Sequence, residues 1–313
     1  MLKRILMTIL VMLLAMIFLS AMPYLVPGDP VKTILGPRAS QELVERVRHD
    51  MGLDLPVPVQ IASFVRRALK GDLGSDFVSG LPVLTLIREV LPHTIILAIS
   101  SLALAALLGI PLGIFSATHP DSLLDRLTWI LSVSFITLPP YVAGLLLLLL
   151  FSVSLGWFPA IGAGDLSRPL DVLQHLVLPA FALALAWIGY LARLVRASLL
   201  EVMTADYIRT AAAYGLRPHT IYFKYALRNA IIPTVAVLGV GLGSLLGGAV
   251  FIEVIFSRPG LGQLIYNSIS DRNYPIVRGG ILVAALMFVF ANLLADLSYR
   301  FLDPRLQAEE LMR

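Results

Sequence analysis

A polar, basic segment between two apolar runs is the part of this sequence best suited to contact another molecule. Residues 206–233 read DYIRTAAAYGLRPHTIYFKYALRNAIIP. On a helix, Asp206 and Arg209 are three residues apart, so they can pair with each other or with charges on a partner. Gly215 suits a left-handed helix C-terminal cap, and Pro218 suits the first turn of a second helix. The segment is therefore predicted to form a helix-turn-helix on the membrane surface. It would serve either as a docking site for another protein or as an amphipathic helix on anionic lipid.

Most other kinds of chemistry are excluded by what the sequence lacks. It contains no G-x-x-x-x-G-K-[ST] motif, so it cannot hydrolyse ATP by that machinery. It has no cysteine, its five histidines have no metal-ligand spacing, and no Ser/His/Asp arrangement can be justified. No charged residue lies at the middle of an apolar run, which disfavours a proton-driven pump or a voltage sensor. Glu253 lies near the end of one run, where we expect water to reach it. Uphill transport would need energy from another subunit.

Composition places the chain in a membrane. Apolar residues make up 58% of it and charged residues 14%, and the mean hydropathy is +0.85. These values are too apolar for a soluble globule of 313 residues. The net charge of +4 is small and dispersed, which argues against nucleic-acid binding.

Six apolar runs meet the length of about 20 residues that a spanning helix needs. They cover residues 5–26, 94–118, 127–157, 175–195, 230–254 and 277–297. Most of the Lys and Arg residues that flank these runs fall on one side, which the positive-inside rule makes cytoplasmic. Both termini are then cytoplasmic and residues 27–91 are external. The first run also resembles a secretory signal, but it exceeds the apolar core of about 7 to 15 residues that a signal has.

We expect one all-α membrane domain over residues 1–313, with residues 27–91 as an external insertion. Within the insertion, Ser40 can cap one helix that ends near Gly52, and a second helix should lie between Pro56 and Gly71. These helices would either cover the outside of the bundle or contact a soluble partner.

Several prolines and glycines within the apolar runs are candidates for a translocation pathway. The Pro139–Pro140 pair must bend or break its helix, and broken helices in membranes tend to border cavities. Small residues spaced four apart allow close helix contact, as at Gly109 and Gly113 or Gly243 and Gly247. Packing and pathway lining both explain the glycines. The candidate pathway residues are Pro139, Pro140, Tyr141, Gly243, Gly247 and Glu253.

The polar segment resembles the coupling loop of permease subunits of bacterial binding-protein-dependent ABC importers, in the dipeptide/oligopeptide/nickel branch. The general loop reads E-A-A, three residues, G, nine residues, I-x-L-P. Here Gly215 matches, residues 209–211 (RTA) stand for E-A-A, and residues 225–228 (YALR) stand for I-x-L-P. The resemblance extends over nearly the whole chain, through the motifs PGDP at 27–30, GDLGS at 71–75, LPHT at 91–94, GIPLGI at 109–114, PGLG at 259–262 and DRNYP at 271–275.

This resemblance implies a transport subunit without catalysis of its own in a bacterial inner membrane. A periplasmic binding protein would deliver dipeptides or oligopeptides, and a second permease would complete the pathway. Two cytoplasmic ATPases would bind ATP and Mg²⁺ and push the coupling segment, residues 196–229. The implied contact residues are Asp206, Arg209, Thr210, Ala211, Ala212, Gly215 and Arg217.

Other substrates of the branch are nickel, glutathione, opines and sugars. A transporter or channel acting alone is the alternative of another class, and a purely structural scaffold is disfavoured by the broken and glycine-rich spans.

Overall fold

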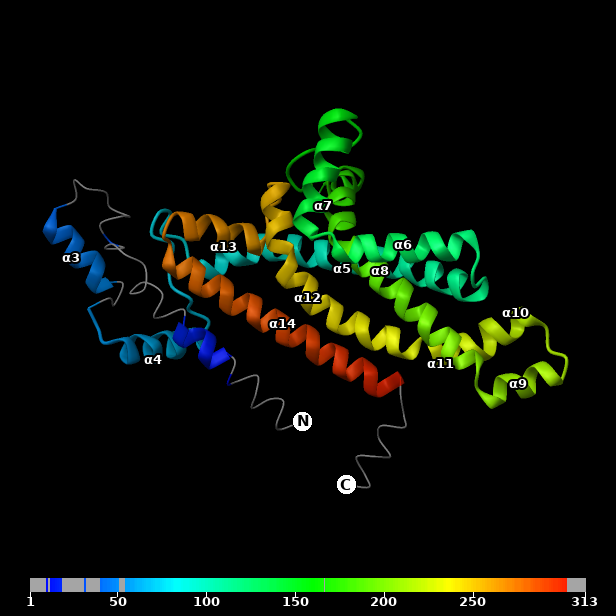
Figure 1. Ribbon diagram of the computed structural model, residues 1–313. Helices are drawn as coiled ribbons and strands as arrows, with labels where there is room; N and C mark the ends of the chain where they lie inside the picture. The colour runs from blue at the N-terminus through cyan, green and yellow to red at the C-terminus, as the bar shows by residue number, and fades with distance from the viewer. Residues whose placement is uncertain are drawn as a thin grey trace, which may run out of the picture. The chain divides into compact units, whose positions relative to one another are not determined.

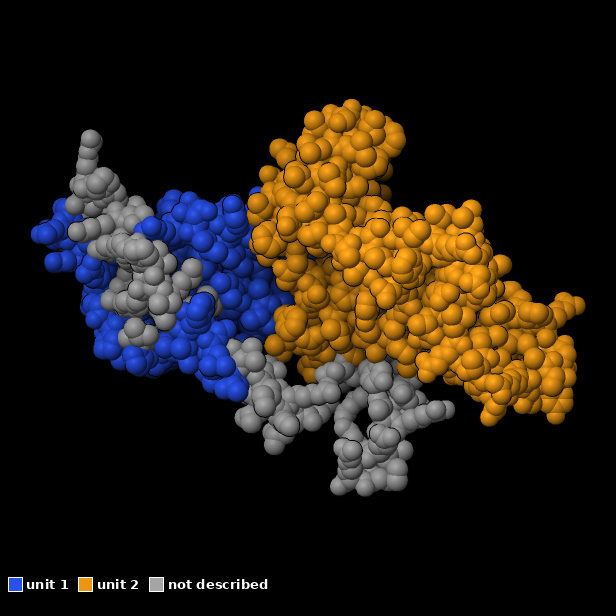
Figure 2. Space-filling view, in the orientation of Figure 1, with its two compact units in different colours: residues 1–94, 259–287 blue, residues 95–258, 288–313 orange. Residues whose placement is uncertain are grey.

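The computed structural model describes residues 10, 12–18, 31, 40–50, 54–165 and 167–302 of the chain. Within these residues the regular structure is helical, as expected for an all-α protein, and no strand is formed. The chain divides into two compact units (Figure 2). One unit combines residues 1–94 with 259–287, and the other combines residues 95–258 with 288–313.

The first unit contains the two helices predicted for the external insertion. Helix α3 covers Gln41–Asp50 and α4 covers Val57–Ala68, so both predictions are confirmed, although Gly52 lies outside the described residues. The unit also holds the start of α5 (Val83–Thr118), α13 (Leu261–Ser270) and the start of α14 (Tyr274–Leu302). Its apolar core joins all of these helices except α3. The buried members of this core are Met16, Phe64, Leu73, Val83, Ile87, Leu261, Ile276 and Leu282.

A buried carboxylate beside the GDLGS motif contacts the DRNYP motif in this unit. Asp76 follows the GDLGS motif, and its Oδ1 accepts hydrogen bonds from Asn273 Nδ2 in the DRNYP motif and from Val78 N. Its Oδ2 accepts from the backbone and hydroxyl of Ser79. Burial alone would raise the pKa of Asp76, but the hydrogen bonds from Ser79, Val78 and Asn273 hold that pKa below its ordinary value. Asn273 of the DRNYP motif therefore fastens the α13–α14 turn to the loop before α5.

The second unit contains the remaining helices. They are α6 (Leu123–Thr137), α7 (Pro140–Leu147), the π-helix η1 (Leu148–Ser154), α8 (Pro169–Met203), α9 (Asp206–Ala213), α10 (Pro218–Thr220), the π-helix η2 (Ile221–Ala226), α11 (Leu227–Ala230) and α12 (Ile232–Ile255). Figure 1 shows α7 turning away from the line of α6, and α9 and α10 following one another beyond the end of α8.

Helix α8 lies at the centre of the second unit's packing. Its residues Leu176, Leu178, Ala180, Ala182 and Leu183 form a buried cluster with parts of α5 and α12. Small residues let the backbones approach closely. A Cβ added at Gly109 would lie 2.8 Å from the Ile188 carbonyl oxygen, and one at Gly113 would lie 2.6 Å from that of Ala192. These two glycines therefore pack α5 against α8, as their spacing suggested.

The count of six spans is not confirmed. Within the described residues, α5, α8, α12 and α14 are each long and apolar enough to cross a membrane. The predicted third span is instead two segments, residues 123–137 and 140–154, that meet at an angle of 104°. It counts as a fifth span only if the bent pair crosses as one. The first predicted span, residues 5–26, lies largely outside the described residues.

Candidate coupling and translocation sites

The turn after α9 has the geometry that its glycine predicted. Gly215 has a φ of +74°, and its N–H donates to the Ala212 carbonyl at 2.9 Å. The next N–H, of Leu216, donates to the Ala211 carbonyl at 3.3 Å. This pair of bonds is the Schellman motif, which satisfies the last carbonyls of a helix. Pro218 then begins α10, so the predicted helix-turn-helix is confirmed.

Helix α9 is anchored on its inner face by a small apolar cluster, which we call the anchor cluster. Ile208 and Ala211 of α9 are buried there against Ala117 of α5 and Leu199 of α8. The other buried members of the anchor cluster come from η2 and α11, and they are Ile221, Ala226 and Ala230. A hydrogen bond of 2.8 Å from Asn229 Nδ2 to the Tyr207 hydroxyl adds a polar tie. The segment is thus held in place by the ends of the long helices.

The outer face of α9 and the turn after it are exposed. Tyr214 is 84% exposed, and Arg209, Thr210, Ala212, Gly215 and Arg217 are exposed as well. Asp206 and Arg209 form the predicted pair, with 3.7 Å between Oδ1 and the guanidinium NH1. Their side chains are 98% and 72% exposed, so the pair contributes little to folding and its charges stay accessible. Of the predicted coupling residues, Ala211 alone is buried, and it belongs to the anchor cluster.

Two contributions to this site were missed by the sequence reasoning. The anchor cluster is built from residues far apart in the chain, and their spacing gives no signal of contact. The π-helix η2 lies where a plain second helix was predicted. π-helical turns are rare and frequently lie at functional sites, but local sequence patterns do not identify them.

The predicted break at Pro139–Pro140 is confirmed. Helix α6 ends at Thr137, and α7 begins at Pro140, where the missing N–H is tolerated. Tyr141 follows on α7 and is half exposed, with its ring centroid 6.0 Å from that of Phe251 on α12. The exposed aromatic pair of Tyr141 and Phe251 therefore lies beside the bend.

The two glycines of α12 have different surroundings. A Cβ at Gly243 would lie 3.1 Å from Phe288 Cδ2 and 3.4 Å from Asn292 Oδ1, both on α14. At Gly247 nothing lies within 4 Å of such an atom. Gly243 therefore packs one helix against another, whereas the side of Gly247 is open.

The burial of Glu253 differs from what we expected. Its side chain is 0% exposed, so the expectation that water reaches it at the end of the span is wrong. The following loop contributes Arg258, which is also fully buried. Burial lowers the pKa of the Arg258 guanidinium, and the charge of Glu253 opposes that shift. The environment of Glu253 is determined by the elements that pack around the end of α12. Its position near the end of the apolar run does not determine that environment. Within the described residues, no group of three or more His, Cys, Asp or Glu side chains could hold a metal ion.

Solved structures share this fold. The chain resembles an inward-facing MetNI methionine ABC transporter with a TM-score of 0.58 and 20% identity, over 70% of this chain and 96% of the other. It also resembles an amino acid ABC transporter with histidines, with a TM-score of 0.54 and 17% identity, over 69% of this chain and 94% of the other.

Sequence relatives match over almost the full length. The glutathione transport system permease protein GsiC of Pectobacterium atrosepticum is 38% identical, over 97% of both chains. A Brucella abortus protein named as a peptide transport system permease is 41% identical, and a Sinorhizobium fredii protein named as a peptide ABC transporter permease is 34% identical, each over 98% of both chains.

Two family profiles account for nearly all of the sequence. Residues 109–308 match the inner membrane component of binding-protein-dependent transport systems, and residues 1–98 match the N-terminal part of such membrane components. The chain belongs to the family of inner membrane components of binding-protein-dependent transport systems, the permease subunits of ABC importers.

Proposed function

We propose that this chain is one of two permease subunits of an ATP-driven importer, and that its α9 segment receives the force of ATP hydrolysis from a cytoplasmic ATPase. The observation that carries the proposal is the geometry of α9, which is anchored on its inner face and exposed on its outer face. A partner can bind the exposed face of a short helix that is held this way. When the partner moves the helix, the long helices packed against its inner face move with it. Asp206, Arg209, Thr210, Ala212, Gly215 and Arg217 make the contact, and Ala211 secures the helix from behind.

The substrate class that we propose is short peptides. Support comes from full-length relatives named for peptide and glutathione transport, because glutathione is itself a short peptide. Selectivity in such a system resides largely in the binding protein, so the permease needs a pathway that accepts many side chains. Import of nickel, opines or sugars in preference to peptides would contradict this assignment.

The remaining partners that we propose are those implied by membership of this family. A periplasmic binding protein delivers the solute to the outer side, which includes residues 27–91. A second permease completes the pathway, and two ATPases bind ATP and Mg²⁺ on the cytoplasmic side, where residues 196–229 and both termini lie. The pathway borders Pro139, Pro140, Tyr141 and Gly247, which lie at the bend or on an open helix face. Gly243 and Glu253 lie on the same helix as Gly247 but are buried, so we do not place their side chains on this surface.

Reconstitution into liposomes tests the proposal. The complete complex, with its second permease, ATPases and binding protein, should accumulate a radiolabelled tripeptide only when ATP is supplied to the ATPase side. The chain alone should accumulate nothing. Uptake by the chain alone would instead establish a transporter that needs no ATPase. Preference of the complete complex for nickel or a sugar over di- and tripeptides would overturn the substrate assignment while leaving the importer intact.

A further inference from the structure

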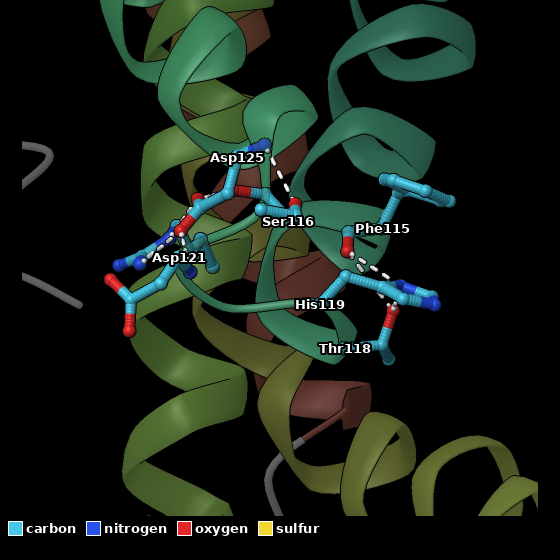
Figure 3. A network of polar contacts seen from close by, with 8 residues as sticks. Phe115, Ser116, Thr118, His119, Asp121 and Asp125 are labelled. Carbon is cyan, nitrogen blue, oxygen red and sulfur yellow. Dashed lines mark hydrogen bonds and ion pairs between the residues drawn. The ribbon is translucent and has the colours of Figure 1, made fainter.

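A polar network joins three helices beside the anchor cluster. Asp125, on the first turn of α6, is at its centre (Figure 3). Arg196 on α8 donates to it twice, from Nε to Oδ1 at 2.8 Å and from NH2 to Oδ2 at 2.9 Å. Ser116 on α5 donates its hydroxyl to Oδ1, and the backbone N–H of Asp121 donates to Oδ2 at 3.0 Å. One carboxylate therefore ties α5, α6 and α8 together.

The geometry of this network is that of a rigid connection. The Asp125 side chain is 8% exposed, and each of its oxygens accepts two hydrogen bonds. A planar guanidinium that binds both oxygens of a carboxylate fixes their relative orientation as well as their distance. The Ser122 hydroxyl accepts from Asp125 N at 3.1 Å and caps α6 at the same point. Removing one partner would leave a buried charge unpaired.

The network lies next to the residues on which α9 rests. Ser116 directly precedes Ala117, and Arg196 lies three residues before Leu199, which is about one helical turn. Ala117 and Leu199 are buried against α9 in the anchor cluster. A displacement of α9 therefore acts on α5 and α8 immediately beside the points where they hold Asp125.

Further along, α6 is held against α8 by close packing. A Cβ added at Gly189 on α8 would lie only 2.6 Å from the carbonyl oxygen of Ser132 on α6. Helix α6 then leads to the bend at Pro139. With the Arg196 contact at its start and the Gly189 contact further along, α6 is fixed to α8 at two places.

We propose that Asp125 and Arg196 are positioning residues that couple α6 to α8, so that displacement of α9 moves α6 and the α6–α7 bend together with α8. This proposal rests on the function proposed above. It adds that energy transfer to the pathway depends on an ion pair outside the surface that contacts the ATPase. Loss of the pair should therefore separate ATP hydrolysis from transport without preventing the ATPase from docking.

The test compares Arg196→Gln and Asp125→Asn in the complete reconstituted complex with Arg168→Gln. Arg168 is a suitable control because its pair with Asp165 is exposed, with 4.0 Å between the charged atoms. We expect both network variants to retain the ATPase during purification and to hydrolyse ATP at near wild-type rates. Peptide uptake per ATP should fall by roughly two- to thirty-fold, the range for mutations along coupling networks. Arg196→Lys keeps the charge but cannot contact both carboxylate oxygens in the same way, so its uptake per ATP should lie between those of wild type and Arg196→Gln. The uptake per ATP of Arg168→Gln should equal that of wild type.

Three results would overturn the proposal. One is unchanged uptake per ATP in Arg196→Gln. Another is a parallel fall of ATP hydrolysis, uptake and the yield of folded complex, which would assign the pair a purely structural role. The third is loss of the ATPase from the purified complex. A wild-type complex without ATP-dependent uptake would instead contradict the proposed function, so the two failures are distinguishable.

A second measurement does not depend on transport. The chain has no cysteine, so spin labels can be placed on introduced cysteines at Leu124 of α6 and Ala197 of α8, both exposed. Dipolar coupling between the labels should be the same with and without ATP in the wild-type complex. In the Arg196→Gln complex it should change between the two states. A coupling that stays constant in the variant would show that packing alone holds α6 to α8.

Discussion

The conformation of Gly215 is what gives the coupling turn its shape, and it can be tested apart from packing. Its φ of +74° is one that L side chains rarely adopt, yet a Cβ there would meet nothing within 4 Å. Gly215→Val should therefore cost about 1–2 kcal/mol in local backbone strain, with open space around its Cβ. We expect the variant to insert normally, while the ATPase copurifies poorly and uptake is lost.

Gly215→Asn is the matched control for this prediction. Asparagine tolerates the left-handed conformation better than other non-glycine residues, and it adds a side chain larger than a methyl group. It should retain most ATPase binding and uptake. If Gly215→Val also retained normal solute-stimulated ATPase activity and uptake, the turn would not be part of the energy-coupling site.

Arg209 allows a test of charge at the same surface. Its pair with Asp206 is mostly exposed, and exposed pairs are worth at most about 1 kcal/mol, so Arg209→Glu should lower the melting temperature by no more than about 2–4 °C. Charge reversal should instead slow ATPase association, with an effect that shrinks as salt is raised. Association rates measured at low and high salt would show this. An unchanged rate at low salt would mean that Arg209 does not face the ATPase.

Some residue roles can be predicted from sequence and others cannot. Gly215 and Pro218 could be identified because tolerance of a positive φ is a property of glycine and the missing backbone N–H is a property of proline. Asp125 and Arg196 are 71 positions apart, and each alone is an ordinary charged residue near a span end. Their pairing depends on how α6 and α8 pack. Glu253 was misjudged for the same reason, since its burial comes from surrounding elements.

At the scale of elements, the sequence predicts breaks better than helix type. The Pro139–Pro140 pair predicts where α6 stops, but the angle of 104° depends on the packing of α7 and is not encoded in that pair. The π-helices η1 and η2 shift the hydrogen-bond register of their segments, and propensities hardly distinguish this from α-helix. Helices α3 and α4 were predictable because serine, proline and apolar spacing mark them locally.

The two glycines of α12 give a prediction about elements, because the same substitution should lower stability at one glycine and block transport at the other. Gly243→Leu would force α12 away from Phe288 of α14, and such overpacking typically costs about 1–3 kcal/mol. The purified complex should melt at a lower temperature. Gly247→Leu has open space, so it should melt like wild type but block uptake if this face borders the pathway. Wild-type uptake in a stable Gly247→Leu complex would remove Gly247 from the pathway.

At the scale of the whole molecule, composition and apolar length established an all-α membrane protein, and ordered motifs predicted the family that the comparisons confirm. The number of spans was harder to predict. Residues 127–157 read as one apolar run because hydropathy does not record direction, yet the chain turns sharply within them. The division into two units was also not evident, because α5 and α14 each pass from one unit to the other without a change in composition.

Orientation in the membrane is the prediction that concerns the entire chain. The positive-inside rule places α9–α10 in the cytoplasm and residues 27–91 outside. Leu69 is 85% exposed at the end of α4, and His219 is exposed on α10. Because the chain has no cysteine, one introduced at either position is the only thiol of this chain. Leu69→Cys should react with an impermeant maleimide in intact spheroplasts, whereas His219→Cys should react only after the membrane is opened. The opposite pattern would invert the topology and place α9 where no cytoplasmic ATPase could reach it, which would also remove the proposed route of energy coupling.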